Sequence, residues 1–281
     1  MTCNQRKPDW LKIKLPTGEL SQEVSNTIKI HKLNTICTSG KCPNQGECWK
    51  CATFMICGNI CTRACKFCNV PTGCPLPLNP NEPMEIAQSV EALKLKHVVL
   101  TSVDRDDIKD FGASHWVKVI RAVKQKTPNV TMEVLIPDFQ GHEDLVSMII
   151  EAKPEVISHN LETVRRLSPH VRSRATYDTS LKVLKQIADS GLVCKSGIML
   201  GLGETRAEIL ETMDDLRKIN CKVMTIGQYL RPSVKNIEVK EYVRPEVFEE
   251  YKQIGLEKGF SFVESGPLVR SSYHAEKHVL S

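Results

Sequence analysis

Three cysteines stand within eight residues of the sequence CTRACKFC, at Cys61, Cys65 and Cys68. A disulfide joins two thiols, and a structural zinc site usually takes four ligands. Thiolates are soft ligands that suit iron–sulfur clusters as well as zinc. A cubane cluster held by three thiolates keeps one iron open, and that iron can bind a small molecule through an amine and a carboxylate. The spacing therefore predicts an iron–sulfur centre that is left incomplete for a ligand.

A second set of three cysteines lies upstream, with gaps of four and five residues, at Cys37, Cys42 and Cys48. A zinc ribbon is the alternative interpretation of this region. It would use two C-x-x-C pairs separated by thirteen residues, Cys48 with Cys51 and Cys65 with Cys68. A ribbon would leave Cys37, Cys42 and Cys61 without a role.

The chain has 281 residues, of which 41% are hydrophobic and 25% are charged, as in ordinary soluble proteins with a sizeable core. The first residues, MTCNQRKPDW, contain no apolar stretch, and no segment approaches 18 apolar residues. We therefore expect no signal peptide, no membrane span and a cytoplasmic location. In a reducing compartment, clustered thiols are expected to bind metal or catalyse rather than form disulfides.

The formal net charge is +5, and the Lys and Arg residues are scattered along the chain. A slightly basic, solvated surface is the simple interpretation, and docking of an acidic partner is the alternative. The sequence has no recognised nucleic-acid motif and no basic stripe, so we expect no nucleic-acid partner.

Short apolar runs suited to buried strands recur along the chain, at 52–57, 97–102, 131–136, 155–159, 195–200 and 223–230. Between them, apolar residues share one face at helical spacing, within 86–93, 116–123, 181–188 and 209–216. Six alternations of strand and helix predict βαβ units and a parallel sheet. The expected fold class is α/β, a partial (β/α)6 TIM-type barrel, with an open sheet as the alternative.

We expect three parts in the chain. Residues 1–51 are an extension with the upstream cysteines, 52–258 the barrel, and 259–281 a C-terminal tail. The chemistry of parallel α/β folds lies at the carboxyl ends of the strands. CTRACKFC follows the first expected strand, so its thiols are expected on that edge.

The spacing C-x3-C-x2-C, with the aromatic Phe67 directly before the last cysteine, resembles the signature of the radical S-adenosylmethionine superfamily. The two cysteine sets in this order resemble one family within it, lipoyl synthase. Blocks that match this family extend along nearly the whole chain, at 101–107, 133–141, 159–164, 196–204, 228–233 and 266–275. The last block contains RSSYHA.

The resemblance implies two [4Fe-4S] clusters and S-adenosylmethionine as cofactors. The cluster of the 61–68 set would bind S-adenosylmethionine and cleave it to a 5′-deoxyadenosyl radical. This radical would remove hydrogens from C6 and C8 of a protein-bound N6-octanoyl-lysine. The auxiliary cluster would supply two sulfur atoms, giving lipoyl-lysine, so the expected enzyme is a sulfurtransferase of lipoate biosynthesis.

The resemblance also implies that Ser272 is the fourth ligand of the auxiliary cluster, beside Cys37, Cys42 and Cys48. An alkoxide is a harder ligand than a thiolate, and one labile corner would let that iron leave as sulfur is given up. A turn or cap hydroxyl is the alternative role of such a serine. Arg270 is expected to orient the tail, and both residues are assigned to the catalytic apparatus.

Polar residues at the ends of the expected strands are candidate contacts for S-adenosylmethionine. Thr101 and Ser102 could bond its amine. His159, Asn160 and Glu162 end another strand, and the last two could hold its ribose or amino-acid part. Lys195 and Arg231 could meet its carboxylate. Each of these residues could instead be an ordinary loop residue whose polar groups are satisfied within the protein.

The expected partners follow from the same resemblance. They are an octanoylated lipoyl carrier domain or glycine-cleavage H protein, a reductant such as flavodoxin or ferredoxin, and an iron–sulfur assembly protein. We expect a monomer. Two other functions are open at this point: another radical sulfur insertion or methylthiolation, and a non-enzymatic zinc or iron–sulfur binding protein.

Overall fold

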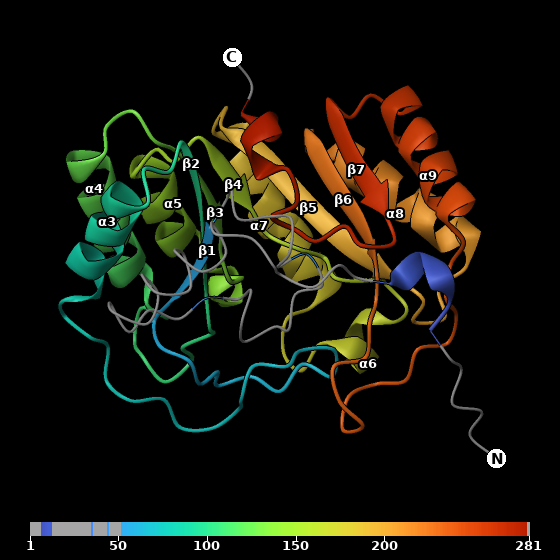
Figure 1. Ribbon diagram of the computed structural model, residues 1–281, viewed down its shortest axis with the longest axis horizontal. Helices are drawn as coiled ribbons and strands as arrows, with labels where there is room; N and C mark the ends of the chain where they lie inside the picture. The colour runs from blue at the N-terminus through green and yellow to red at the C-terminus, as the bar shows by residue number, and fades with distance from the viewer. Residues whose placement is uncertain (1–6, 13–34, 36–43, 45–51, 280–281) are drawn as a thin grey trace.

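The computed structural model describes residues 7–12, 35, 44 and 52–279. Its main feature is one sheet of seven parallel strands that pair in chain order (Figure 1). The strands are β1 (Ala52–Ile56), β2 (His97–Ser102), β3 (Thr131–Leu135), β4 (Val156–Ser158), β5 (Val193–Leu200), β6 (Val223–Gln228) and β7 (Phe262–Gly266). This sheet forms the wall of a partial barrel.

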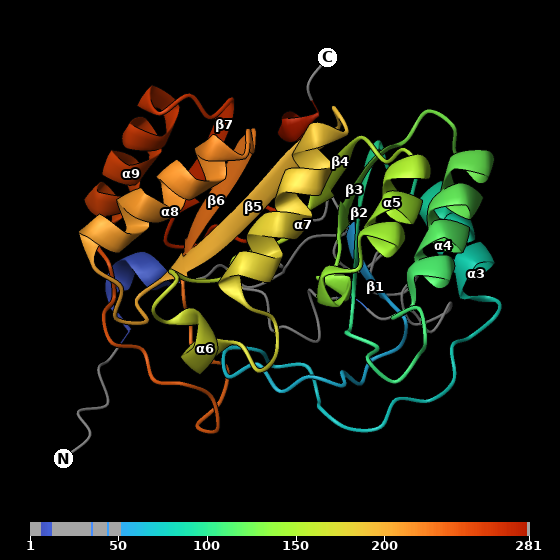
Figure 2. The same ribbon diagram turned by 180° about the vertical axis from the view of Figure 1, so that it is seen from behind.

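Helices connect the strands and cover the outer face of the sheet, as Figure 2 shows from behind. They are α3 (Glu82–Ala92), α4 (Ala113–Lys126), α5 (Glu143–Glu151), α6 (Ser168–Val171), α7 (Tyr177–Asp189), α8 (Arg206–Lys218) and α9 (Pro245–Glu257). Short 3-10 turns are η1 (Asp9–Leu11), η2 (Phe139–Gly141) and η3 (Ala275–His278). No helix in the described part of the chain is long and apolar enough to cross a membrane.

The helices form because their apolar residues share one face that packs on the sheet. In α4, Trp116, Val119, Ile120 and Val123 are completely buried. The start of α8 has a capping box, in which the Thr205 side chain and Glu208 satisfy each other's free backbone N–H groups. These local signals determine where the helices form, and the helices and buried strands together supply the core.

The expectation of a partial α/β barrel is confirmed, and each of the six expected strands is present. The structure adds a seventh, β7, in the stretch that the sequence interpretation assigned to the tail. Only Val263 of β7 is buried, because β7 is an edge strand paired on one side with β6. A strand of this kind has no continuous apolar run, which is why the sequence did not reveal it. The division into three parts stays a prediction.

The carboxyl ends of all seven strands lie along one edge of the sheet, the lower edge in Figure 1. After β7 the chain turns back and crosses the inner face of the sheet toward the opposite edge, where η3 lies against β2 (Figure 1). Residues 267–279 are called the C-terminal segment below. It lies on the face of the sheet that the helices leave open.

Candidate functional site

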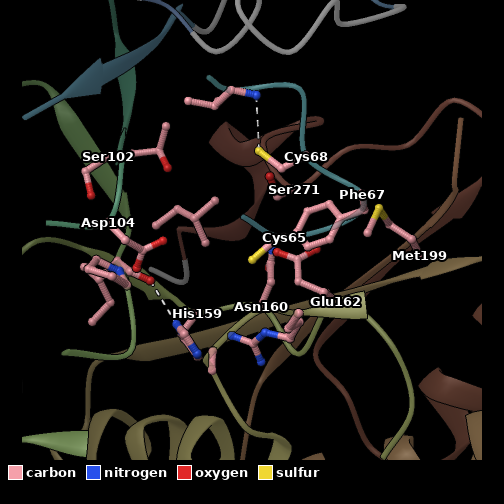
Figure 3. A pocket seen from close by; sticks show the side chains of 18 of the residues that line it. Cys65, Phe67, Cys68, Ser102, Asp104, His159, Asn160, Glu162, Met199 and Ser271 are labelled. Atoms are coloured by element: carbon pink, nitrogen blue, oxygen red, sulfur yellow. Dashed lines mark hydrogen bonds between the residues drawn. The ribbon is translucent and has the colours of Figure 1, made fainter. Parts of the chain in front are cut away.

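A cavity of about 310 Å³ lies at the carboxyl ends of the strands. Its wall comes from the loop after β1, the ends of β2 to β6, and the C-terminal segment. Figure 3 shows Cys65, Cys68, Asn160 and Ser271 around this space. Segments that are distant in sequence therefore meet in one place, as expected for this edge of a parallel sheet.

The three thiols of the 61–68 loop all line this cavity. The Cys61 sulfur accepts hydrogen bonds of 3.4 Å from the backbone N–H groups of Arg63 and Asp104. The Cys68 sulfur accepts one of 3.4 Å from Val70. Such N–H groups stabilise negative charge on sulfur and tune the potential of a bound cluster. This set of soft donors, arranged around a common space, fits a cluster held by three thiolates.

Burial raises the pKa of Cys61 to about 12, with a further contribution from the nearby Asp104 carboxylate. Burial likewise raises the pKa of Cys68 to about 11. Without bound metal, both groups are therefore neutral thiols at pH 7. Binding of iron must displace these protons, because the ligand is the thiolate.

Arg63 ties the cysteine loop to the sheet. Its guanidinium makes two hydrogen bonds of 2.8 Å to the Asp106 carboxylate and approaches Asp138 at 2.8 Å and Asp104 at 3.3 Å. The side chain is 4% exposed. These carboxylates follow β2 and β3, so Arg63 holds the loop against the ends of two strands. Sequence reasoning missed this contact, because Asp106 and Asp138 lie 43 and 75 positions away from Arg63.

The predicted polar residues Thr101, Ser102, His159, Asn160 and Glu162 all line the cavity. The Oδ1 atom of Asn160 is buried, and it has no hydrogen-bond partner among the described residues. Burial raises the pKa of Glu162, and its backbone is held on β5 by hydrogen bonds with Gly197 and Met199. An unsatisfied acceptor in a cavity wall indicates a polar ligand, because such an atom is costly to leave without a partner.

His159 has a structural role. One ring nitrogen contacts the Ile136 carbonyl oxygen at 2.9 Å, and the other contacts the Ser180 hydroxyl at 2.9 Å. Burial lowers the pKa of His159 to about 4, so the ring is neutral at pH 7. Both nitrogens are occupied, and the ring therefore shapes the wall of the cavity without offering a bond to a ligand.

Two predicted contacts, Lys195 and Arg231, do not line the cavity. Lys195 is completely buried, and its Nζ lies 2.8 Å from the Glu133 carboxylate. Lys195 stands two residues before the cavity-lining Gly197 on β5. Its side chain therefore points to the same face of the sheet, one layer of side chains closer to the amino end of the strand. Arg231 lies beyond the end of β6 and bonds the Asn236 and Val234 carbonyls of its own loop. The geometry supports neither residue as a ligand of the carboxylate.

Phe67 and Arg270 both line the cavity, as does Ser271, the neighbour of Ser272. In Figure 3 the Phe67 ring lies beside Met199, a wall residue that sequence reasoning did not single out. Asp104 was also missed, and its carboxylate lies 3.6 Å from the Cys61 sulfur. Both belong to blocks recognised as a whole, in which no single residue stood out.

The predicted ligands Cys37, Cys42 and Cys48 lie outside the described residues, and so does Cys51 of the zinc alternative. Two described residues flank the upstream ligands. Thr35 forms an antiparallel bridge with Phe54 of β1. Asn44, between Cys42 and Cys48, donates a hydrogen bond of 2.7 Å to the Leu268 carbonyl oxygen. The C-terminal segment thus meets the upstream part of the chain beside the cavity.

Comparison with known proteins agrees with this geometry. The model of the Radical SAM superfamily matches residues 55–216. A lipoyl synthase of Treponema denticola is 99% identical over 283 residues, covering 100% of this chain and 98% of that protein. The chain belongs to the lipoyl synthase family. A lipoyl synthase of Parabacteroides distasonis is 60% identical over 281 residues, covering 99% of this chain and 100% of its own.

Among solved structures, Streptococcus suis SuiB bound to S-adenosylmethionine superposes with a TM-score of 0.61 at 13% identity. The match covers 75% of this chain and 48% of SuiB, and at this identity it supports the fold alone.

Family membership confirms the expected activity. The chain is a radical S-adenosylmethionine sulfurtransferase that inserts two sulfur atoms at C6 and C8 of a protein-bound octanoyl-lysine. It uses S-adenosylmethionine and two [4Fe-4S] clusters, and the auxiliary cluster is the sulfur source. The zinc-binding protein and the other radical reactions are thereby set aside.

Proposed function

We propose that sulfur insertion takes place in the 310 Å³ cavity, where Cys61, Cys65 and Cys68 hold the cluster that binds S-adenosylmethionine. The observation that carries this proposal is that all three thiols line the same space as the polar residues at the strand ends. When bound, this cluster supplies the electron that starts radical chemistry on S-adenosylmethionine. The protein's task is to bind, orient and shield the reacting groups.

The polar wall suits the methionyl and ribose parts of S-adenosylmethionine. Thr101 and Ser102, at the end of β2, can bond the amine. The bare Oδ1 of Asn160 can accept from a ribose hydroxyl or from the amine, and Glu162 lies beside it (Figure 3). Phe67 covers the same side of the space from the cysteine loop. These four polar groups come from the ends of β2 and β4, which both pair with β3 and are thereby held in fixed register.

The apolar part of the wall suits an octanoyl chain. Val103, Leu135, Ile136, Ile198 and Met199 line the cavity together. An eight-carbon chain leaves water when it enters such a space, and each buried CH₂ contributes about 0.8 kcal/mol to that transfer. The same residues exclude water from a site in which carbon radicals form.

The auxiliary cluster belongs, in this proposal, to Cys37, Cys42, Cys48 and Ser272. The hydrogen bond from Asn44 to Leu268 supports it, because it joins the 42–48 stretch to the C-terminal segment four residues before Ser272. Arg270 orients that segment, and its guanidinium donates to the Val269 carbonyl at 2.6 Å. A serine corner is the weakest bond of the set, and the cluster can therefore open there as it gives up sulfur.

The partners and the compartment are also proposed. The substrate is an octanoyl-lysine on a lipoyl carrier domain or glycine-cleavage H protein. Flavodoxin or ferredoxin supplies electrons, and an iron–sulfur assembly protein restores the auxiliary cluster. We place the protein in the cytoplasm as a monomer, with residues 1–51 and 259–281 closing the cluster face of the barrel.

Anaerobic reconstitution tests the ligand assignment. We expect about eight irons and eight sulfides per chain, and about four of each when Cys61, Cys65 and Cys68 are changed together to Ala. The triple variant should form no 5′-deoxyadenosine from S-adenosylmethionine. Cys74→Ala is the matched control, because Cys74 is an exposed thiol of the same region. About one zinc and no sulfide in the native chain would overturn the assignment.

Replacement of Ser272 by Cys tests the labile corner. A thiolate binds iron more tightly than an alkoxide, so both clusters should assemble while sulfur release stops. Product mass on an octanoyl-lysine peptide measures release, and 5′-deoxyadenosine measures radical formation in the same reaction. Normal lipoyl product from Ser272→Cys would refute the argument.

A further inference from the structure

A cluster of buried polar side chains lies one layer below the cavity, toward the amino ends of the strands. The Lys195 ammonium bonds the Glu133 carboxylate at 2.8 Å, and the other Glu133 oxygen accepts from the Ser158 hydroxyl at 3.0 Å. The Nδ1 atom of His278 lies 3.1 Å from the same Lys195 nitrogen. All four side chains are completely buried. Glu133, Ser158 and Lys195 are called the polar layer below. His278, a residue of the C-terminal segment, thus lies within this layer.

The hydrogen-bond partners fix the proton on His278. An ammonium group only donates, so Nδ1 of His278 accepts from Lys195 and the ring proton is on Nε2. The Nδ1 atom of His97, at the start of β2, lies 2.8 Å from Thr131 Oγ1, and that hydroxyl can donate either to this ring nitrogen or to the Lys96 carbonyl oxygen.

The remaining ring nitrogen of each of these two histidines is its Nε2 atom. Both are buried without a hydrogen-bond partner among the described residues. Burial lowers the pKa of His278 to about 3, and the nearby Lys195 ammonium lowers it further. His278 is therefore a neutral ring at pH 7, which can accept from the Lys195 ammonium.

The C-terminal segment connects this layer to the cavity through consecutive turns. Backbone hydrogen bonds join Tyr273 to Arg270 at 2.9 Å, Ala275 to Ser272 at 3.4 Å and Lys277 to His274 at 3.0 Å. At the cavity end, Val269 lies so close to β6 that a Cβ on Gly227 would come within 2.2 Å of its carbonyl oxygen. The segment is thus held at both ends, and Ser272 lies between them in the chain.

We propose that His278 is a positioning residue, which anchors the C-terminal segment in the polar layer and so holds Ser272 at the face where the auxiliary cluster assembles. The inference rests on the proposed role of Ser272. Lys195, assigned from the sequence to the cofactor, then serves as the receiving group of this anchor. Without His278 the buried ammonium loses one of its acceptors, and the segment loses its hydrogen bond to the polar layer.

Hydrogen–deuterium exchange of the reconstituted enzyme tests the anchor. His278→Leu keeps the bulk of the side chain but cannot accept from Lys195. We expect backbone amides of residues 272–278 to exchange about tenfold faster or more, while those of β5 and β6 are unchanged. His278→Gln, whose amide oxygen accepts and whose nitrogen donates, should restore slow exchange. Lys277→Ala is the matched control, because Lys277 is an exposed neighbour in the same turn.

Iron content and radical formation separate anchoring from ligation. His278→Leu should lose about half of its iron, yet still cleave S-adenosylmethionine to 5′-deoxyadenosine, because the cluster of the cysteine loop is untouched. If residues 272–278 of His278→Leu exchange at the native rate, the anchor proposal is overturned, whatever the role of Ser272. Ser272→Ala is measured in the same way. If this variant keeps all its iron and exchanges slowly, Ser272 is not the ligand, and the anchor proposal is then judged by the exchange of His278→Leu alone.

Discussion

At the scale of single residues, Arg63 shows how the chain positions its reactive thiols. One guanidinium meets three carboxylates, of which Asp106 and Asp138 are almost completely buried. The proximity of Arg63 lowers the pKa of Asp106 and Asp138 despite their burial, so both stay ionised. Arg63 and these two carboxylates join the loop that contains Cys61 to the ends of β2 and β3.

Removing the Arg63 charge takes the closest cation away from these buried carboxylates, leaving Asp106 with Arg174 at 3.7 Å. We expect Arg63→Gln to lower the free energy of unfolding by about 3–5 kcal/mol and to reduce iron binding at the cysteine loop. Arg63→Lys keeps the charge but not the two-pronged contact, so its loss should be smaller. Denaturant unfolding gives the free energy. Lys185→Gln is the control, because Lys185 pairs with the exposed Asp189 and its loss should change the free energy of unfolding by about 1 kcal/mol or less.

His159 gives a pH dependence with a definite sign. Its folded-state pKa, about 4, lies below the ordinary value of 6.5, so the unfolded chain takes up the proton first. The stability contributed by the neutral ring is fully present above pH 6.5 and falls as the pH drops toward 4, by about 1.4 kcal/mol per pH unit. Unfolding of native protein and His159→Gln at pH 7.5 and 5.5 should show the steeper loss in the native chain. Equal losses would contradict this account.

At the scale of elements, the strands and the helices facing them were predictable because buried runs and helical faces repeat at distinct periods. Contacts that depend on how deep a side chain lies within the barrel were not predictable. Lys195 begins the expected strand 195–200 and was assigned to the cofactor, yet it stands two residues before the cavity-lining Gly197 on β5 and lies one layer lower. The anchoring role of His278 was invisible for the same reason, since its partners Glu133 and Lys195 lie on other elements.

Strand β5 approaches β6 closely at Gly197, and this contact can be tested. A Cβ there would lie 2.3 Å from Thr225 Oγ1 and 3.1 Å from Asn160 Oδ1. We expect Gly197→Ala to cost about 1–3 kcal/mol of stability and to raise the KM for S-adenosylmethionine severalfold, because Asn160 must shift. Formation of 5′-deoxyadenosine at varied cofactor concentration measures KM. Gly73→Ala is the control, since its Cβ would meet ordinary van der Waals contact at 3.5 Å.

At the scale of the whole molecule, the net charge of +5 has a use if the octanoylated carrier is acidic. Opposite charges speed encounter and weaken as salt screens them. We expect the affinity for an acidic octanoylated carrier domain to fall when ionic strength rises from about 0.05 to 0.5 M, because the electrostatic screening length shortens over this range. Calorimetry or anisotropy at several salt concentrations measures this, with an isolated octanoyl-lysine peptide as the uncharged comparison. Affinity independent of salt for the carrier would exclude electrostatic docking.

The hydrogen bond between Asn44 and Leu268 spans 224 positions of the chain. A ribosome synthesises Leu268 224 positions after Asn44, so this contact cannot form until that length of chain has been added. Asn44, which stands between Cys42 and Cys48, therefore lacks this partner while the whole barrel is synthesised. If Ser272 completes their cluster, loading is necessarily a late event, and a chain that stops before residue 268 never presents the finished site to the iron–sulfur assembly machinery.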